Sequence, residues 1–314
     1  MVAEGDDRQT AAEIRSLLPL LRELNDLKRL YSGNLRPFSL ATQVFRGACQ
    51  ALLNGSRLEA LEWSTTLVAA ARLGAISPEA LGDAELPEPE IESIFDRALS
   101  AHNAFSPALL RDFSGCVGKL GGRLEGNFQF SEGNWAQRLC RAPRAGATCP
   151  GKPRIALEPP EMHSDHCGLV AVYGFILADL FEADRGDAWL IGLCHHFHNA
   201  YLPDSGFTGE MLLGDSLDQV IQNFRKKALS SVHESYRARV EHLLTEIADD
   251  ASPLARTFHA ADTIDRVVQM EHYERAARFR VKQALDDLEL VHEGPAQAFQ
   301  KSLLQSIGLF PGFD

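Results

Sequence analysis

Histidines gather in one short stretch of this sequence. Five of the eleven lie between residues 163 and 198, namely His163, His166, His195, His196 and His198. A neutral imidazole offers one lone pair to a metal ion and can donate its other N–H group to a neighbouring acceptor, so histidine is a frequent metal ligand in proteins. The pattern indicates metal chemistry in the second half of the chain.

Residues 188–200 give the strongest local signal. They read Ala-Trp-Leu-Ile-Gly-Leu-Cys-His-His-Phe-His-Asn-Ala, an apolar helical pattern that ends in three histidines within four residues. Several unpartnered imidazoles at the end of a buried helix would cost free energy. We therefore predict that at least one of His195 and His196 binds a metal. The alternative is a capped helix end with histidines on the surface.

A carboxylate stands in an apolar helical segment further along the chain. The segment Phe258-His-Ala-Ala-Asp-Thr-Ile-Asp-Arg places Asp262 after small residues. A buried carboxylate rarely lacks a partner, and a cation shared with distant histidines would provide one. The alternative partner is Arg266, one helical turn later. We expect Asp265 to lie on the surface of the same helix.

Helices must position these residues, because apolar side chains recur with helical spacing and strand-like alternation is nearly absent. We expect helices over 10–32, 39–53, 56–73, 88–104, 106–119, 165–183, 186–199, 215–250, 253–277, 279–292 and 295–307. Residues 120–162 are rich in Gly and Pro, which indicates a long loop that serves as a linker or a lid. The sequence thus predicts an all-α protein with a helical half (1–120), a loop or linker (121–162) and a metal-binding helical half (163–314).

A weak internal repeat relates the two helical halves. Residues 39–47 resemble residues 164–172 at an offset of 125. At this offset, His166, His195 and His196 correspond to Ala41, Ala70 and Ala71. The pattern favours a degenerate tandem duplication in which only the second half keeps polar ligands. Chance similarity between amphipathic helices is the alternative.

Composition limits the classes of function. The chain has 314 residues with 45% hydrophobic content, enough for one large helical core or two smaller ones. The formal net charge of -12 disfavours nucleic-acid binding, although a bound metal would still attract a small anion. The acidic N-terminus indicates no signal peptide, and we find no run of about 18 apolar residues that would cross a membrane. The six cysteines show no CxxC spacing, so we expect a cytoplasmic protein with reduced thiols.

The order of these motifs resembles the HD-domain metallohydrolases, most closely their nucleotidase-like branch, over about residues 160–280. In that family one histidine opens a long helix, a His-Asp pair ends the next helix, and an aspartate lies in a later helix. Ser-Asp-His166, Cys-His195-His196 and Ala-Ala-Asp262 stand at these places. The resemblance implies an HD-domain-like helical bundle with His166, His195, His196 and Asp262 as metal ligands.

Two positions depart from the family pattern. His196 replaces the defining aspartate, and Asn199, which cannot act as a base, stands where the branch has a catalytic glutamate. Asp204 falls where the branch keeps an aspartate near its substrate, so Asp204, His198 and Asn199 are the candidates for catalytic roles. A site with three imidazoles and one carboxylate favours a divalent transition metal (Zn, Fe, Co, Ni or Mn) over Mg²⁺.

The resemblance implies three functions that stay open. The first is a metal-dependent HD-type phosphohydrolase that acts on a small phosphorylated molecule such as a nucleotide. The second is an HD-type iron oxygenase, a group that uses additional histidines. The third is a catalytically degenerate HD domain with a regulatory or scaffold role. We expect no nucleic-acid or membrane partner and keep a homodimer as an open alternative. Lesser candidates for the site are His163, His259, Glu210 and the basic triplet 225–227.

Overall fold

The structure is a computed structural model, and it describes residues 2–31, 38–101, 104–120, 126, 128–152, 154–155, 158–277, 280–287 and 289–309. These residues form helices and loops with two isolated β-bridges and no sheet, which confirms the predicted all-α class. The α-helices are α1 (Val2–Asp26), α2 (Leu40–Asn54), α3 (Ala60–Leu73), α4 (Pro78–Asp83), α5 (Glu88–Ser100), α6 (Pro107–Ser114), α7 (Trp135–Leu139), α8 (His163–Leu177), α9 (Arg185–Cys194), α10 (Gly206–Leu213), α11 (Leu217–Leu229), α12 (Glu234–Glu246), α13 (Pro253–Ala277) and α14 (Gln297–Ile307). Short turns of other helix types are η1 (Val117–Lys119), η2 (Ala178–Phe181), η3 (Phe197–Ala200), η4 (Gly214–Ser216) and the π-helical η5 (Gln283–Asp287).

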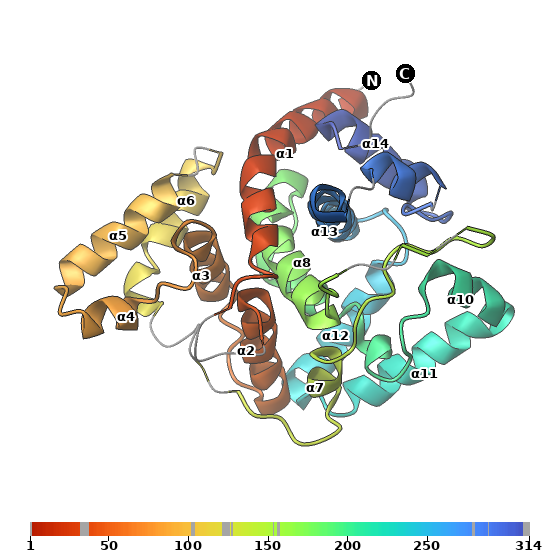
Figure 1. Ribbon diagram of the computed structural model, residues 1–314, viewed down its shortest axis with the longest axis horizontal. Helices are drawn as coiled ribbons and strands as arrows, with labels where there is room; N and C mark the ends of the chain where they lie inside the picture. The colour runs from red at the N-terminus through yellow and green to blue at the C-terminus, as the bar shows by residue number, and fades with distance from the viewer. Residues whose placement is uncertain are drawn as a thin grey trace.

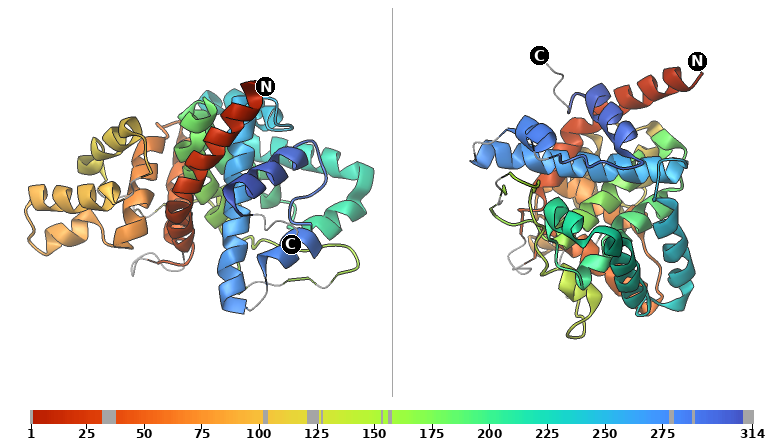
Figure 2. Two further views of the ribbon diagram at one scale, coloured as in Figure 1. Left: turned by 90° about the horizontal axis from the view of Figure 1, so that it is seen from above. Right: turned by 90° about the vertical axis from the view of Figure 1, so that its right-hand side faces the viewer.

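Helix α8 lies at the centre of the fold. It packs against α1, α2, α3, α9 and α13, while α4, α5 and α6 form a lobe to one side (Figure 1). The views in Figure 2 show this lobe on the side of the molecule opposite α10 and α11. Because α1 and α2 pack on α8, one hydrophobic cluster includes residues from both halves of the chain.

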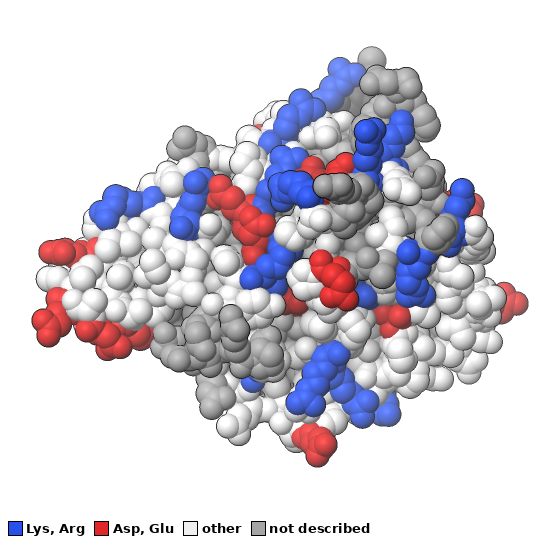
Figure 3. All heavy atoms as spheres, viewed as in Figure 1, with Lys and Arg blue, Asp and Glu red and all other residues white. Residues whose placement is uncertain are grey.

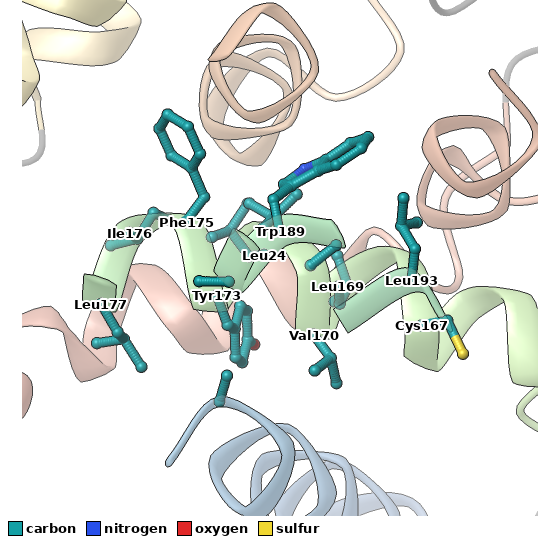
Figure 4. Packing of buried hydrophobic residues seen from close by; sticks show 14 of the residues in the cluster. Leu24, Cys167, Leu169, Val170, Tyr173, Phe175, Ile176, Leu177, Trp189 and Leu193 are labelled. Atoms are coloured by element: carbon teal, nitrogen blue, oxygen red, sulfur yellow. The ribbon is translucent and has the colours of Figure 1, made fainter. Parts of the chain in front are cut away.

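Every residue of α8 is buried, which explains its nearly uniform apolar sequence, since a helix covered on all sides needs no polar face. Leu169 and Tyr173 of α8 lie near Leu24 of α1 and Trp189 of α9 (Figure 4). The stretch 163–181, α8 with η2, is long and apolar enough to cross a membrane, which corrects the expectation that no such run exists. In the structure, 83% of its most apolar window is buried inside the protein, as in the core helix of a globular fold.

Helices α8 and α9 approach each other closely at Gly192. A Cβ atom at this position would lie 2.5 Å from the Cα atom of Ala171, so a larger residue would meet backbone rather than a movable side chain. We expect Gly192→Ala to lower the free energy of unfolding by about 1–3 kcal/mol, measured by chemical denaturation. Gly82→Ala in α4 is the matched control, because a Cβ there meets nothing within 4 Å and should leave stability equal or slightly higher. Equal stability of the two variants would contradict this close packing.

The segments related by the weak repeat lie side by side. Helix α2 packs on α8, where a Cβ on Gly168 would lie 2.5 Å from the carbonyl oxygen of Ala41. This contact is compatible with two related halves, and the duplication and the three-part division of the chain stay predictions.

Acidic side chains gather at the edge of the molecule where α4 and α5 lie (Figure 3). Between residues 76 and 92 the sequence has no Lys or Arg, and its exposed acidic residues are Asp83, Glu85, Glu88, Glu90 and Glu92. A surface of this charge repels a phosphate backbone, and the absence of nucleic-acid binding stays a prediction.

Candidate metal centre

Three helices bring the predicted ligands to one place. His166 lies in the first turn of α8, His195 and His196 follow the last residue of α9, and Asp262 lies within α13. The start of α8 is fixed by Asp165, whose carboxylate accepts a hydrogen bond from the backbone N–H of Met162 at 3.0 Å. Because α9 and α13 both pack on α8, residues about 100 positions apart in the sequence meet.

The distances among these side chains suit a shared cation. His166 Nε2 lies 3.1 Å from both His195 Nε2 and Asp262 Oδ1, and His195 Nε2 lies 3.8 Å from Asp262 Oδ1. The ligand nitrogens of His166, His195 and His196 all lie within 4.8 Å of one another. Two donors bound tetrahedrally to one Zn²⁺ ion lie roughly 3.3 Å apart. The three histidines therefore form a group that could hold a metal ion, with the Asp262 carboxylate beside it.

The hydrogen-bond partner of Nδ1 determines which nitrogen of each imidazole carries the hydrogen. Each Nδ1 atom meets an oxygen that can only accept a hydrogen bond: His166 Nδ1 at 2.7 Å from Asp265 Oδ2, His195 Nδ1 at 2.8 Å from the Gly192 carbonyl, and His196 Nδ1 at 2.7 Å from Asn199 Oδ1. The Nδ1 atoms are therefore the donors, and the Nε2 atom of each neutral ring carries a lone pair.

These lone pairs converge in a buried place. Burial lowers the pKa of His195 and of His196 well below the usual value, and the neighbouring imidazoles lower both further. The rings of His195 and His196 are therefore neutral at physiological pH, and since Nδ1 is the donor in each, their Nε2 atoms carry lone pairs. The His195 lone pair lies 3.1 Å from His166 Nε2, and a buried acceptor is costly unless a donor or a positive centre meets it. A cation at this point would satisfy these lone pairs.

Asp265 supports His166, and its place corrects the sequence prediction. It was expected on the helix surface, but its side chain is fully buried. Its Oδ2 atom accepts hydrogen bonds from His166 Nδ1 and, at 2.8 Å, from Lys28 Nζ. Although burial acts in the opposite direction, the charge of Lys28 and the bond from His166 hold the pKa of Asp265 below its usual value. Periodicity missed this inward face because α13 is buried on more than one side.

Lys28 connects the N-terminal segment to this centre. Only 4% of the residue is exposed, and its Nζ atom also donates to Glu161 Oε1 at 2.5 Å. The turn after α1, the end of the long loop and α13 therefore meet at one ammonium group. A buried lysine is rare unless it is paired, and here two carboxylates pair with it.

Asn199, predicted among the catalytic candidates, contacts a histidine. Its Oδ1 accepts from His196 Nδ1, and its Nδ2 donates to the Leu202 carbonyl at 3.3 Å, which fixes the orientation of the amide. Asn199 thus orients His196 in the way that a carboxylate or carbonyl commonly orients a metal-binding imidazole.

A cavity of about 210 Å³ opens beside the candidate cation position. His195, His196 and Asp262 line it together with residues of α10, α13 and the C-terminal segment. Residues 144, 146–148, 160 and 161 of the long loop form another part of its wall. The segment predicted as a linker or lid therefore helps to shape the site.

Asp204 lines this cavity and anchors the loop. Its carboxylate accepts hydrogen bonds from the backbone N–H groups of Ala145 at 3.0 Å and Gly206 at 2.9 Å. Although burial opposes the shift, the Arg144 charge and these two bonds lower the pKa of Asp204. The group is therefore ionised at neutral pH, and it can hold structure or accept a hydrogen bond but is a poor proton donor.

The other predicted candidates divide between the cavity and its surroundings. Glu210 lines the cavity, and burial raises its pKa. His198 is buried and does not line the cavity, and desolvation lowers its pKa to about 3. His163 donates from Nδ1 to the Ala142 carbonyl at 3.0 Å, and its Nε2 atom lies 3.8 Å from Asp204 Oδ2. His259 contacts the Asp249 carbonyl, and residues 225–227 on α11 lie outside the cavity.

Sequence reasoning missed several residues of the site, and each reaches it through a contact distant in sequence. Arg144, Glu161 and His292 line the cavity, and Lys28 lies behind it. Arg266 was considered only as an ion-pair partner of Asp262, but it lies 3.8 Å from that carboxylate and faces the same cavity. No local spacing pattern marks Arg144, Glu161, His292 or Lys28.

The fold and the site define an all-α protein with a group of three histidines that could hold a metal ion and the Asp262 carboxylate beside it. No family model matches the chain, and no curated protein and no solved structure matches it either. The resemblance to HD-domain metallohydrolases therefore stays a prediction that rests on the sequence motifs alone.

Proposed function

We propose that this protein is a metal-dependent phosphohydrolase that acts on a small phosphorylated molecule in the cytoplasm. The observation that carries the proposal is the convergence of His166, His195 and His196, whose Nδ1 hydrogens are all engaged elsewhere and whose Nε2 atoms face one another. The cysteines are free thiols, in keeping with a reducing compartment.

The donor set favours a transition metal. Three imidazoles and one carboxylate suit Zn, Fe, Co, Ni or Mn better than Mg²⁺, which prefers oxygen ligands. Such a cation would lower the pKa of a bound water and polarise a phosphoryl oxygen.

The protein's own groups around this position have separate tasks in the proposed reaction. Asn199 and Asp265 hold two of the imidazoles, and Asp204 holds the loop that closes one wall. Glu210 lines the cavity, and burial raises its pKa, so it is a stronger proton acceptor than an ordinary carboxylate. Glu210 therefore replaces Asp204 and His198 as the best candidate for proton transfer.

One observation favours a second candidate function, an iron-dependent oxygenase. The His163 side chain is fully buried, its Nε2 atom has no hydrogen-bond partner among the described residues, and its ring centroid lies 5.0 Å from that of His196. An additional imidazole of this kind suits a site that handles iron and oxygen.

Elemental analysis of protein purified without chelator tests the proposal. We expect about one equivalent of a transition metal in the wild-type protein and turnover in a panel of phosphorylated small molecules. His242→Ala is the matched control, because this side chain is 75% exposed and lies apart from the site, and the variant should keep its metal. Protein that contains no metal and binds none would contradict the proposal and favour a scaffold role. Bound iron with oxygen-dependent turnover would favour the oxygenase.

A further inference from the structure

Two arginines in the cavity have no role in the candidate metal centre. Arg144 comes from the long loop and Arg266 from α13, and both line the cavity with His195, His196 and Asp262. Their side chains are only 16% and 18% exposed. Burying two positive charges in one cavity is unfavourable unless anions pair with them.

The hydrogen bonds of these guanidinium groups are incomplete. Arg144 Nη1 is buried and has no partner among the described residues, and Arg144 Nε lies 3.5 Å from Glu161 Oε2. Arg266 donates from Nη2 to the Leu290 carbonyl, while its Nη1 lies 3.8 Å from Asp262 Oδ2, beyond hydrogen-bond range. Burial and the positive charge of Arg144 lower the pKa of Arg266, although Asp262 opposes the shift. The charges of Glu161 and Asp204 raise the pKa of Arg144 although burial opposes that shift. The donors of both side chains are thus partly unused.

The carboxylates near the arginines also have other partners. Glu161 pairs with Lys28 as well as with Arg144, Asp204 accepts two backbone N–H groups, and Asp262 faces His166 at the candidate cation position. Burial raises the pKa of Glu210, although the charges of Arg266 and Arg144 oppose the shift. An anion supplied from outside would complete the arrangement.

We propose that Arg144 and Arg266 bind the phosphoryl group of a phosphate monoester, one of whose oxygens lies at the cation. This inference rests on the proposed function and names its substrate class. A monoester dianion has three terminal oxygens and two negative charges, whereas a diester has two such oxygens and one charge. A cation and two guanidinium groups match the monoester, because each planar guanidinium can donate two parallel hydrogen bonds to phosphoryl oxygens.

The rest of the cavity can accept the alcohol part of such a monoester. Phe207, Met270 and Leu290 line it with apolar surface, and the ring of Phe207 stacks on His292 with centroids 4.3 Å apart. A leaving group with an apolar face would bury surface against these residues.

Binding of inorganic phosphate to the metal-loaded full chain, measured by calorimetry, tests the inference. We expect Arg144→Met and Arg266→Met each to raise the dissociation constant for phosphate by about 10-fold or more, without loss of cation affinity. Arg141→Met is the matched control, because Arg141 is an exposed residue of the same loop outside the cavity and should bind phosphate like wild type. Arg144→Lys should recover part of the affinity, because it restores charge without the planar fork.

A second readout uses the wild-type protein and therefore does not depend on the folding of a variant. We expect faster hydrolysis of p-nitrophenyl phosphate than of bis(p-nitrophenyl) phosphate. Unchanged phosphate binding in both methionine variants, or a preference for the diester, would overturn the inference and leave a metal-dependent hydrolase in place. Arginine-dependent phosphate binding with no hydrolysis of any phosphate ester would support this anion site and overturn the proposed function instead.

Discussion

His166→Ala is expected to lower cation affinity by more than about 100-fold and to abolish hydrolysis. His166 is the centre of the candidate site, since its Nε2 atom lies 3.1 Å from both His195 Nε2 and Asp262 Oδ1. Loss of a residue that merely holds a metal ligand reduces affinity about 10–100-fold, and loss of the ligand itself should exceed that. Titration with Zn²⁺ against a competing chelator measures the effect.

Asn199→Ala provides a graded comparison for this prediction. Asn199 contacts His196 Nδ1 and would not touch the cation, so its loss should reduce affinity about 10–100-fold and no more. His242→Ala should bind the cation like wild type. Circular dichroism establishes that each variant is folded. Wild-type cation affinity in a folded His166→Ala protein would show that the converging imidazoles are not a metal site.

The helices were predictable where apolar residues with helical spacing extend over the whole helix. The segment expected over 253–277 coincides with α13, and that expected over 39–53 differs from α2 by one residue. The single helix expected over 215–250 is instead η4, α11 and α12, separated by a turn before His233. The backbone N–H of His233 donates to the Leu52 carbonyl, and its side chain caps α12. This break depends on a tertiary contact, which local periodicity does not contain.

The candidate ligands were predictable because polar side chains are unusual in apolar helices. Three histidines at the end of an apolar helix and a carboxylate within another are anomalies that a sequence displays directly. The residues around the ligands are not unusual in their local sequence. Lys28 and Asp265 are separated by 237 residues, and Arg144 belongs to a loop whose path only the folded chain defines. Their roles depend on three-dimensional proximity alone.

Lys28→Met is expected to destabilise the protein by about 3–5 kcal/mol, because it leaves the Asp265 carboxylate buried with an uncompensated charge. Asp265 is fully buried, and Lys28 Nζ, at 2.8 Å, is the cation that pairs with it. The same change should reduce cation affinity about 10–100-fold, because Asp265 Oδ2 also orients His166. Chemical denaturation measures the first effect, and Zn²⁺ titration under native conditions measures the second.

Two further variants distinguish the effect of an unpaired buried charge from the effect of weaker contact between the N-terminal segment and α13. Arg22 of α1 pairs with Glu271 of α13 at 2.7 Å, but its side chain is 38% exposed, so Arg22→Met should cost less than about 1 kcal/mol. Combining Lys28→Met with Asp265→Asn removes both charges at the buried position, and the double variant should be more stable than Lys28→Met alone. An equal decrease in the free energy of unfolding for Lys28→Met and Arg22→Met would mean that any ion pair between the N-terminal segment and α13 stabilises the protein to the same extent. A larger loss for Lys28→Met, with recovery in the double variant, would mean that the N-terminal segment supplies the charge that keeps the imidazole of His166 in place.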